Sequence, residues 1–162
     1  MTPHVLERGF HEKDRSQIVA LLREYWAALD VPLCFQGFDA EIEALPGSYA
    51  PPGGAMIVAR DRAGAGLVGC VALRPVPGTP DMCEMKRLYV RPAARGTGLG
   101  RTLAIAAMDE GRRLGYRRMF LDTLPSLTAA QTLYRSLGFR QTGTGGGEPP
   151  VVLFECNLED GR

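Results

Sequence analysis

A glycine-rich turn with two flanking arginines is the part of the sequence whose residue types and spacing best suit chemistry. It consists of Arg95, Gly96, Thr97, Gly98, Leu99, Gly100 and Arg101, between one segment typical of a strand and one typical of a helix. Glycines allow a tight turn and a close approach of a ligand to the main-chain amides. Free N–H groups at a helix start favour phosphate oxygens, and the two arginines could add charge-assisted bonds. The turn indicates a candidate site for an anionic ligand.

Two familiar phosphate-binding motifs do not fit this spacing. A dinucleotide-binding Gly-x-Gly-x-x-Gly that starts at Gly96 and Gly98 would need a third glycine where Arg101 stands. A Walker A loop needs a Gly-Lys-Ser/Thr sequence, and none follows. The glycine turn alone therefore does not identify the ligand.

Two blocks of the sequence resemble the GNAT N-acetyltransferase superfamily. In the first, the superfamily signature Gln/Arg-x-x-Gly-x-Gly/Ala falls on Arg95, Gly98 and Gly100. That signature follows the strand-like run Glu84-Met85-Lys86-Arg87-Leu88-Tyr89-Val90 and Pro92. The second block, Leu133-Tyr134-Arg135-Ser136-Leu137-Gly138-Phe139, resembles the family's following helix and its exit. The blocks occur in the family's order and at its usual separation, and the resemblance covers about residues 57–142.

The resemblance implies a direct transfer of an acetyl group from acetyl-CoA to a primary amine of a small molecule or a protein. Tyr134 matches the tyrosine that in many members protonates the departing thiolate, and Glu84 matches a carboxylate that acts as base, directly or through water. Backbone groups of one strand would pair with the pantetheine arm, and amides of the turn would hold the pyrophosphate. The implied cofactor-binding residues are Leu88, Tyr89, Val90, Arg95, Gly96, Thr97, Gly98, Leu99, Gly100 and Arg101.

Acid–base chemistry makes these two assignments sensible. A lysine-like amine with a pKa of ~10.4 is neutral in only about one molecule in a few thousand at pH 7, and only the neutral amine can attack a thioester. A positioned acid or base is typically worth ~10²–10⁴ in rate. Structural alternatives stay open: Tyr134 could be packed on the core, and Glu84, which stands beside Lys86 and Arg87, could simply be ion-paired at a surface. Many family members also have asparagine seven residues before the tyrosine, where this chain has Leu127.

Other side chains are candidates for the walls of the site. Asp122 and Thr123, at the end of an expected strand, could line the cofactor cleft or make local turn bonds. An aromatic group in the N-terminal part is typical of core, although part of it could wall the acceptor site. Its members are Tyr25, Trp26, Phe35 and Phe38.

Two other functions compete with acetyl transfer. The first is a non-catalytic acyl-CoA-binding or sensing module that keeps the glycine turn but lacks turnover. The second is nucleic-acid binding through residues 86–118, which hold nine basic and two acidic side chains. The chain's net charge is only +1, so no nucleic-acid partner is expected. Acetyl-CoA and an amine are the expected partners, and a homodimer is a further candidate because such look-alikes are frequently dimers.

Hydrophobic periodicity predicts the elements that position these residues. Strands are expected at 5–10, 55–60, 67–73, 82–90, 118–122, 139–142 and 151–158, and helices at 14–29, 38–45, 98–114 and 126–137. The pattern predicts a mixed α/β (α+β) class. With the resemblance, this becomes a GNAT-like three-layer fold with a mostly antiparallel, twisted sheet of six or seven strands and about four helices, in one domain over 1–162.

Four local features are also expected. Asp14 is the predicted N-cap of the first helix, and Thr128 with Gln131 fits a capping box at the last one. Residues 75–80, which contain three prolines, predict a rigid connector. Because side chains alternate along a strand, one face of strand 82–90 is expected to carry Glu84, Lys86, Leu88 and Val90.

Composition limits the other classes of protein. A chain of 162 residues suits one soluble domain, and two histidines make a His-ligated metal site unexpected. Without a C-x-x-C pair, the cysteines are expected to be reduced thiols in a cytoplasmic protein; they are Cys34, Cys70, Cys83 and Cys156. The longest helical apolar run, 103–108, is too short to span a membrane.

Overall fold

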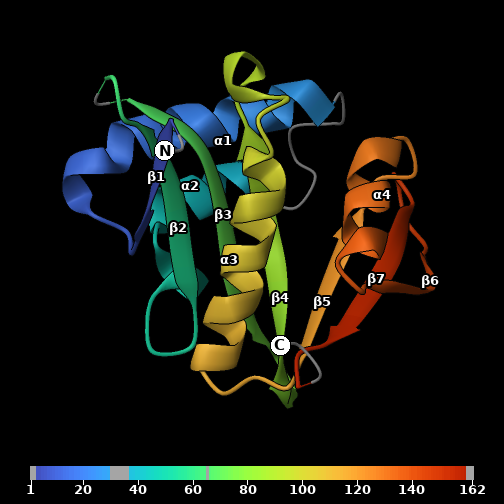
Figure 1. Cartoon of the computed structure of the whole chain (residues 1–162). Coiled ribbons are helices and arrows are strands. Elements are labelled where there is room, and N and C mark those ends of the chain that lie inside the picture. The colour runs from blue at the N-terminus through green and yellow to red at the C-terminus, as the bar shows by residue number, and fades with distance from the viewer. Residues whose placement is uncertain (1–2, 30–36, 65, 160–162) are drawn as a thin grey trace.

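A seven-stranded sheet forms the centre of the computed structural model, which describes residues 3–29, 37–64 and 66–159 (Figure 1). The strands are β1 (His4–Arg8), β2 (Ala55–Asp61), β3 (Leu67–Val76), β4 (Thr79–Val90), β5 (Arg118–Thr123), β6 (Arg140–Gly145) and β7 (Val151–Asn157). Their order across the sheet is β1-β2-β3-β4-β5-β7-β6. All neighbouring strands are antiparallel except β4 and β5, which are parallel. The expected mixed α/β fold with a mostly antiparallel sheet is confirmed.

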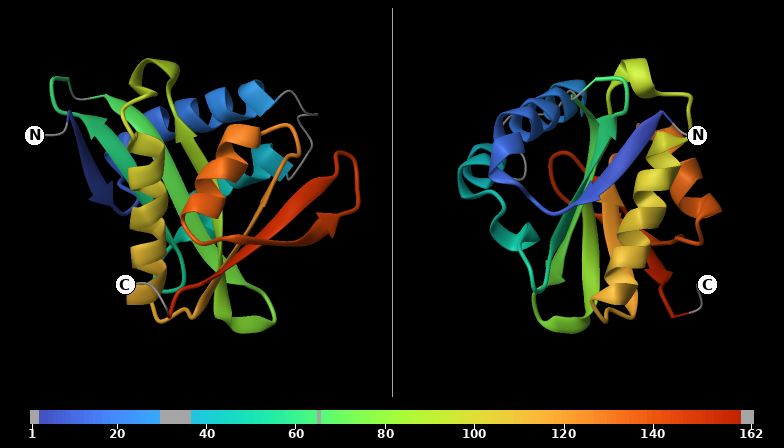
Figure 2. Two further views of the ribbon diagram at one scale, coloured as in Figure 1. Left: turned by 45° about the vertical axis from the view of Figure 1, so that its right-hand side comes forward. Right: turned by 60° about the vertical axis from the view of Figure 1, so that its left-hand side comes forward.

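Helices cover both faces of this sheet, as Figure 2 shows. The described residues form four α-helices, namely α1 (Arg15–Leu29), α2 (Phe38–Ala44), α3 (Leu99–Arg113) and α4 (Thr128–Ser136). Alternation along β2 supplies both cores: Val58 packs in the cluster of α1 and α2, whereas Ile57 packs in the cluster of α3 and α4. Side chains that alternate along the strands thus pack against the apolar faces of the helices on either side of the sheet.

The two parallel strands, β4 and β5, stay together over only a short stretch. Their pairing covers Met82, Cys83 and Glu84 on β4, opposite residues 118–120 of β5. Beyond it the strands diverge, as the ribbon in Figure 1 shows. The later residues of β4 therefore keep a strand neighbour on the β3 side only, and the β5 side of this backbone is open to a strand-like ligand.

A β-bulge lies on β4 where the strands diverge. Cys70 of β3 pairs with Tyr89, but Ala72 pairs with Lys86, so two residues of β4 stand opposite one of β3. Arg87, at this position, has a positive φ of 62°. The inserted residue reverses the alternation of side chains after it.

This bulge makes the expectation of one shared face on β4 wrong. Leu88 and Val90 pack against the core beneath α3, on the same side as Met85. Glu84 and Lys86, which alternate with Met85, face the side of α1 and α2 instead. Glu84 and Lys86 thereby lie on the opposite face of the sheet from Leu88 and Val90.

Two of the other local expectations, the connector at 75–80 and the N-cap at Asp14, are also wrong. The expected connector at 75–80 is a hairpin, since Val76 pairs with Thr79, and the register shift beside Pro75 accommodates a residue without an N–H group. Instead of an N-cap at Asp14, a 3-10 turn (Glu12–Asp14) runs directly into α1.

The expected capping box on α4 is absent as well. Leu127 occupies the N-cap position and makes no side-chain capping bond. The Nε2 group of Gln131 instead donates to the carbonyl oxygens of Leu124 at 3.2 Å and Pro125 at 3.1 Å. Gln131 therefore fixes the loop that leaves β5 rather than the helix end itself.

Candidate active site

The glycine turn presents a row of main-chain donors at the start of α3. Gly96 and Gly98 both have a φ of 82°, which glycine adopts at little cost. Gly98 is the N-cap of α3, and Thr102 is the first residue whose amide bonds to its carbonyl, at 3.0 Å. Within the described residues, the amides of 96–101 have no backbone acceptor. These donors stand at the positive end of a 15-residue helix, an arrangement that suits an anion.

The two arginines of the turn are exposed and anchored to its surroundings. Arg95 donates from Nε to the carbonyl of Val90 at 2.9 Å and lies over the ring of Tyr89, 5.6 Å from its centroid. Arg101 donates from Nη1 to the hydroxyl of Ser136 on α4 at 2.8 Å. Both cations therefore lie beside the row of amides, between the end of β4 and α4.

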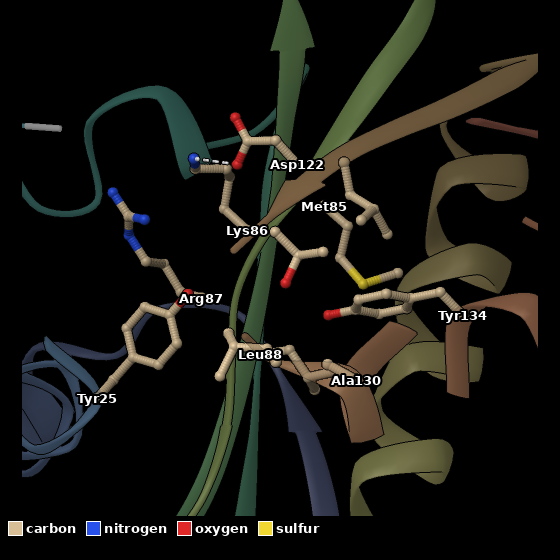
Figure 3. A pocket seen from close by; sticks show the side chains of 11 residues that line it. Tyr25, Met85, Lys86, Arg87, Leu88, Asp122, Ala130 and Tyr134 are labelled. Carbon is tan, nitrogen blue, oxygen red and sulfur yellow. Dashed lines mark ion pairs between the residues drawn. The ribbon is translucent and has the colours of Figure 1, made fainter. Parts of the chain in front are cut away.

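A pocket of about 100 Å³ opens where β4 and β5 diverge (Figure 3). Its walls come from four elements that are far apart in the sequence: α1, β4, β5 and the region of α4. The lining residues are Tyr25, Met85, Lys86, Arg87, Leu88, Leu121, Asp122, Thr123, Leu127, Ala130 and Tyr134. Asp122 and Thr123 thus line this pocket, and their place in a cofactor cleft stays a prediction.

Tyr134 projects from α4 with its hydroxyl directed into this pocket, as Figure 3 shows. Its ring packs edge-on against Phe139, with centroids 5.8 Å apart, so the side chain has a fixed orientation. Only 8% of the residue is exposed, and this burial raises the pKa of Tyr134 above its ordinary value. The phenol is both packed on the core and aimed at the pocket, and at neutral pH it is a proton donor.

Glu84 is buried beside the pocket but is not among the residues that line it. Its Oε1 accepts a hydrogen bond from Nε of Arg74 at 3.0 Å, and its Oε2 lies 3.7 Å from Nζ of Lys86. Glu84 is therefore ion-paired, as one interpretation held, but it is buried and not at a surface. Its role as a base stays a prediction.

Lys86 is a buried basic residue in the lining of the pocket. Its side chain is 6% exposed, and Nζ lies 3.7 Å from Glu84 and 3.9 Å from Asp122. Burial lowers the pKa of Lys86, against the opposing effect of the Glu84 carboxylate. Sequence reasoning treated Lys86 only as a counter-ion of Glu84 and gave it no place in the site. A lysine in the middle of an expected central strand was the available signal, because such residues are seldom buried without a partner.

The aromatic group near the N-terminus divides between core and site. Trp26 and Phe38 stack with centroids 3.7 Å apart in the core under α1 and α2. Tyr25 lines the pocket. Phe35 and Cys34 lie outside the described residues. Cys70, Cys83 and Cys156 are buried thiols that form no disulfide with one another.

The glycine turn, the diverging strands and the pocket are those of a known family. The acetyltransferase (GNAT) family matches residues 18–139 of the sequence. The chain belongs to this family. An uncharacterized N-acetyltransferase of Schizosaccharomyces pombe is 45% identical over 130 residues, which cover 80% of this chain and 78% of that protein. The GNAT match extends further toward the N-terminus than the motifs of the sequence alone, and the resemblance inferred from those motifs is confirmed.

Solved structures of GNAT proteins share the whole fold. A GCN5-related N-acetyltransferase of Kribbella flavida has a TM-score of 0.76 at 25% identity, covering 96% of this chain and 98% of that one. A Salmonella typhimurium structure with its cofactor acetyl-CoA has a TM-score of 0.76 at 20% identity, with coverage of 99% and 97%. At these identities the second likeness concerns the fold alone.

Two further findings concern the described residues of this GNAT chain. They contain no group of three or more His, Cys, Asp or Glu side chains placed to hold a metal ion. In the same ranges, no helix has both the length and the apolar character needed to cross a bilayer.

Proposed function

We propose that this chain is an acetyl-CoA-dependent N-acyltransferase that moves an acetyl group directly to a primary amine of a small molecule or protein. The observation that carries the proposal is the hydroxyl of Tyr134, directed into a pocket at the point where β4 and β5 diverge. The amides of 96–101 follow from the end of the same strand β4. A long cofactor with an anionic end could therefore lie along β4 with its reactive end at Tyr134.

The residues present fit coenzyme A in three respects. Amides of 96–101, with Arg95 and Arg101 beside them, would hold the pyrophosphate. Backbone groups of Leu88, Tyr89 and Val90 would pair with the pantetheine arm, since this edge of β4 lacks a β5 partner. The Salmonella typhimurium neighbour with acetyl-CoA supports the same cofactor.

Tyr134 and Glu84 would divide the proton transfers between them. Acetyl-CoA would supply the acyl group as a thioester. When the amine nitrogen bonds to the carbonyl carbon and the C–S bond breaks, Tyr134 would give its proton to the departing thiolate. Glu84 would receive the proton of the amine, directly or through water. No covalent enzyme intermediate is needed, in keeping with the burial of Cys70 and Cys83.

A thiol-release assay with acetyl-CoA and a panel of amines, polyamines, amino acids and peptides tests the proposal. Tyr134→Phe is expected to lower kcat by ~10²–10⁴ while acetyl-CoA still raises the melting temperature. Tyr116→Phe is the matched control, because the Tyr116 hydroxyl donates to the carbonyl of Gly53 at 2.6 Å, outside the pocket.

Each outcome separates the competing functions. Unchanged turnover in Tyr134→Phe would remove its role as acid. Thermal stabilisation by acetyl-CoA without turnover of any amine would favour a non-catalytic acyl-CoA-binding module. No stabilisation at saturating acetyl-CoA would contradict both functions.

A further inference from the structure

Asp122 brings a carboxylate to the pocket for which the described residues offer no hydrogen-bond donor. Alternate residues of β5, Met119 and Leu121, pack in the core under α3 and α4, so Asp122 faces the side of α1 and α2. Its side chain is 23% exposed, and it lines both the pocket and a small adjoining hollow that reaches Tyr25 and Leu29. The carboxylate is therefore reachable from this side of the sheet.

The other carboxylates close to this region already have strong partners. Glu84 accepts a hydrogen bond from Arg74 at 3.0 Å. Glu41 receives two bonds from Arg87, at 2.5 and 2.8 Å, and a third from the hydroxyl of Tyr49. Asp122 has only the ammonium group of Lys86, at 3.9 Å, which is beyond hydrogen-bond distance. Among these three acids, only Asp122 accepts no hydrogen bond from a described side chain.

Lys86 shows what kind of group this space accommodates. Its ammonium lies between the carboxylates of Glu84 and Asp122, at the end of an unbranched alkyl chain. Figure 3 shows this ion pair on the opposite side of the pocket from Tyr134. The pocket is small, with a volume of about 100 Å³. Only the narrow end of an acceptor fits there.

We propose that Asp122 binds the ammonium group of the acceptor on the α1 and α2 side of the pocket, and that it thereby selects primary amines carried on a slender alkyl arm. This inference rests on the proposed function and names a substrate-binding residue for it. A second ammonium beside Lys86 would also weaken the charged form of the incoming amine, because like charges disfavour each other. The site would thus capture the amine as a cation, and the proton that it must lose before attack would pass to water.

Steady-state kinetics of Asp122→Asn with the amines that the wild type accepts tests this inference. The KM for the amine is expected to rise about ten- to hundredfold, the effect of losing a hydrogen bond to a charged group. The KM for acetyl-CoA should stay unchanged, and Asp122→Glu should restore part of the affinity for the amine.

Asp81→Asn is the matched control. Asp81 also carries a carboxylate on this pair of strands, but it pairs with Arg118 at 3.1 Å, beside the end where the strands stay together. This variant should leave both KM values unchanged.

The outcomes distinguish the inference from the proposed function. If the wild type acetylates an amine and Asp122→Asn leaves its KM unchanged, the inference is wrong and the proposed function stands. An equal rise in the KM for acetyl-CoA would show a structural role and would also overturn the inference. If the wild type turns over no primary amine of the panel, the proposed function fails and the inference fails with it.

Discussion

Replacing Glu41 is expected to cost an unusually large share of the protein's stability, because it removes the carboxylate that pairs with a buried arginine. Arg87, the residue at the bulge of β4, has a side chain only 3% exposed. Its Nη2 and Nε atoms lie 2.5 and 2.8 Å from the two carboxylate oxygens of Glu41 on α2. The guanidinium also lies over the ring of Phe38, 5.1 Å from its centroid. These contacts join α2 to the strand that forms the pocket.

The magnitude follows from the burial of this pair. Burial by itself would lower the pKa of Arg87, but the hydrogen bonds with Glu41 raise it above its ordinary value, so the arginine stays charged. Removing one partner of a buried ion pair typically costs about 3–5 kcal/mol. For a domain of this size, each kcal/mol lowers the melting temperature by about 2–4 °C. Glu41→Gln is therefore expected to lower it by about 6–20 °C.

Urea and thermal unfolding of Glu41→Gln measure this cost, with Glu43→Gln as the control. Glu43 lies on the same helix and is exposed, so the same loss of charge should change the midpoint little. The double variant Glu41→Leu/Arg87→Met removes both charges and should lose less stability than the two single changes together. A loss of only about 0–1 kcal/mol in Glu41→Gln, typical of exposed ion pairs, or full additivity in the double variant, would refute this reasoning.

Two further predictions follow from titrating groups. Burial raises the pKa of Tyr134, so its hydroxyl should stay protonated beyond about pH 10. A plot of log kcat against pH should therefore not fall between pH 7 and about pH 10. A fall in that range without unfolding would contradict the role of Tyr134 as acid. Burial also raises the pKa of both Cys70 and Cys83 to about 12, so only about one thiol in 10⁴ is ionised at pH 8. Neither cysteine should therefore react with Ellman's reagent until the protein unfolds. Mass spectrometry of peptides from folded and unfolded samples identifies the labelled cysteine, and labelling of either before unfolding would be the contrary result.

Much of the fold was predictable because its signals are local. The apolar spacing and the punctuating glycines predicted a helix over 98–114, and α3 runs from Leu99 to Arg113. Strand 118–122 matches β5 to within one residue. In the site, the glycine turn and Tyr134 could be identified from neighbouring residues along the chain, which the matched GNAT family shares.

The errors concern features that depend on long-range pairing. Prolines at 75–80 suggested a connector, yet β3 and β4 continue through them because the hairpin register places Pro75 at an irregularity. Strict alternation along β4 placed Leu88 on the wrong face, since a bulge at Arg87 is stabilised by Glu41, 46 residues away. Neither partner is visible in a local window.

The sequence by itself determined the family, most of the elements and the position of the glycine turn, because each depends on residues that are neighbours along the chain. Only the tertiary structure decided which acidic group could meet an acceptor. Arg74 donates a hydrogen bond to Glu84 because β3 lies beside β4. Asp122 instead faces an open pocket, because β5 turns away from β4 beyond Glu84. The availability of a carboxylate depends on its neighbours in space, and strand divergence sets those neighbours.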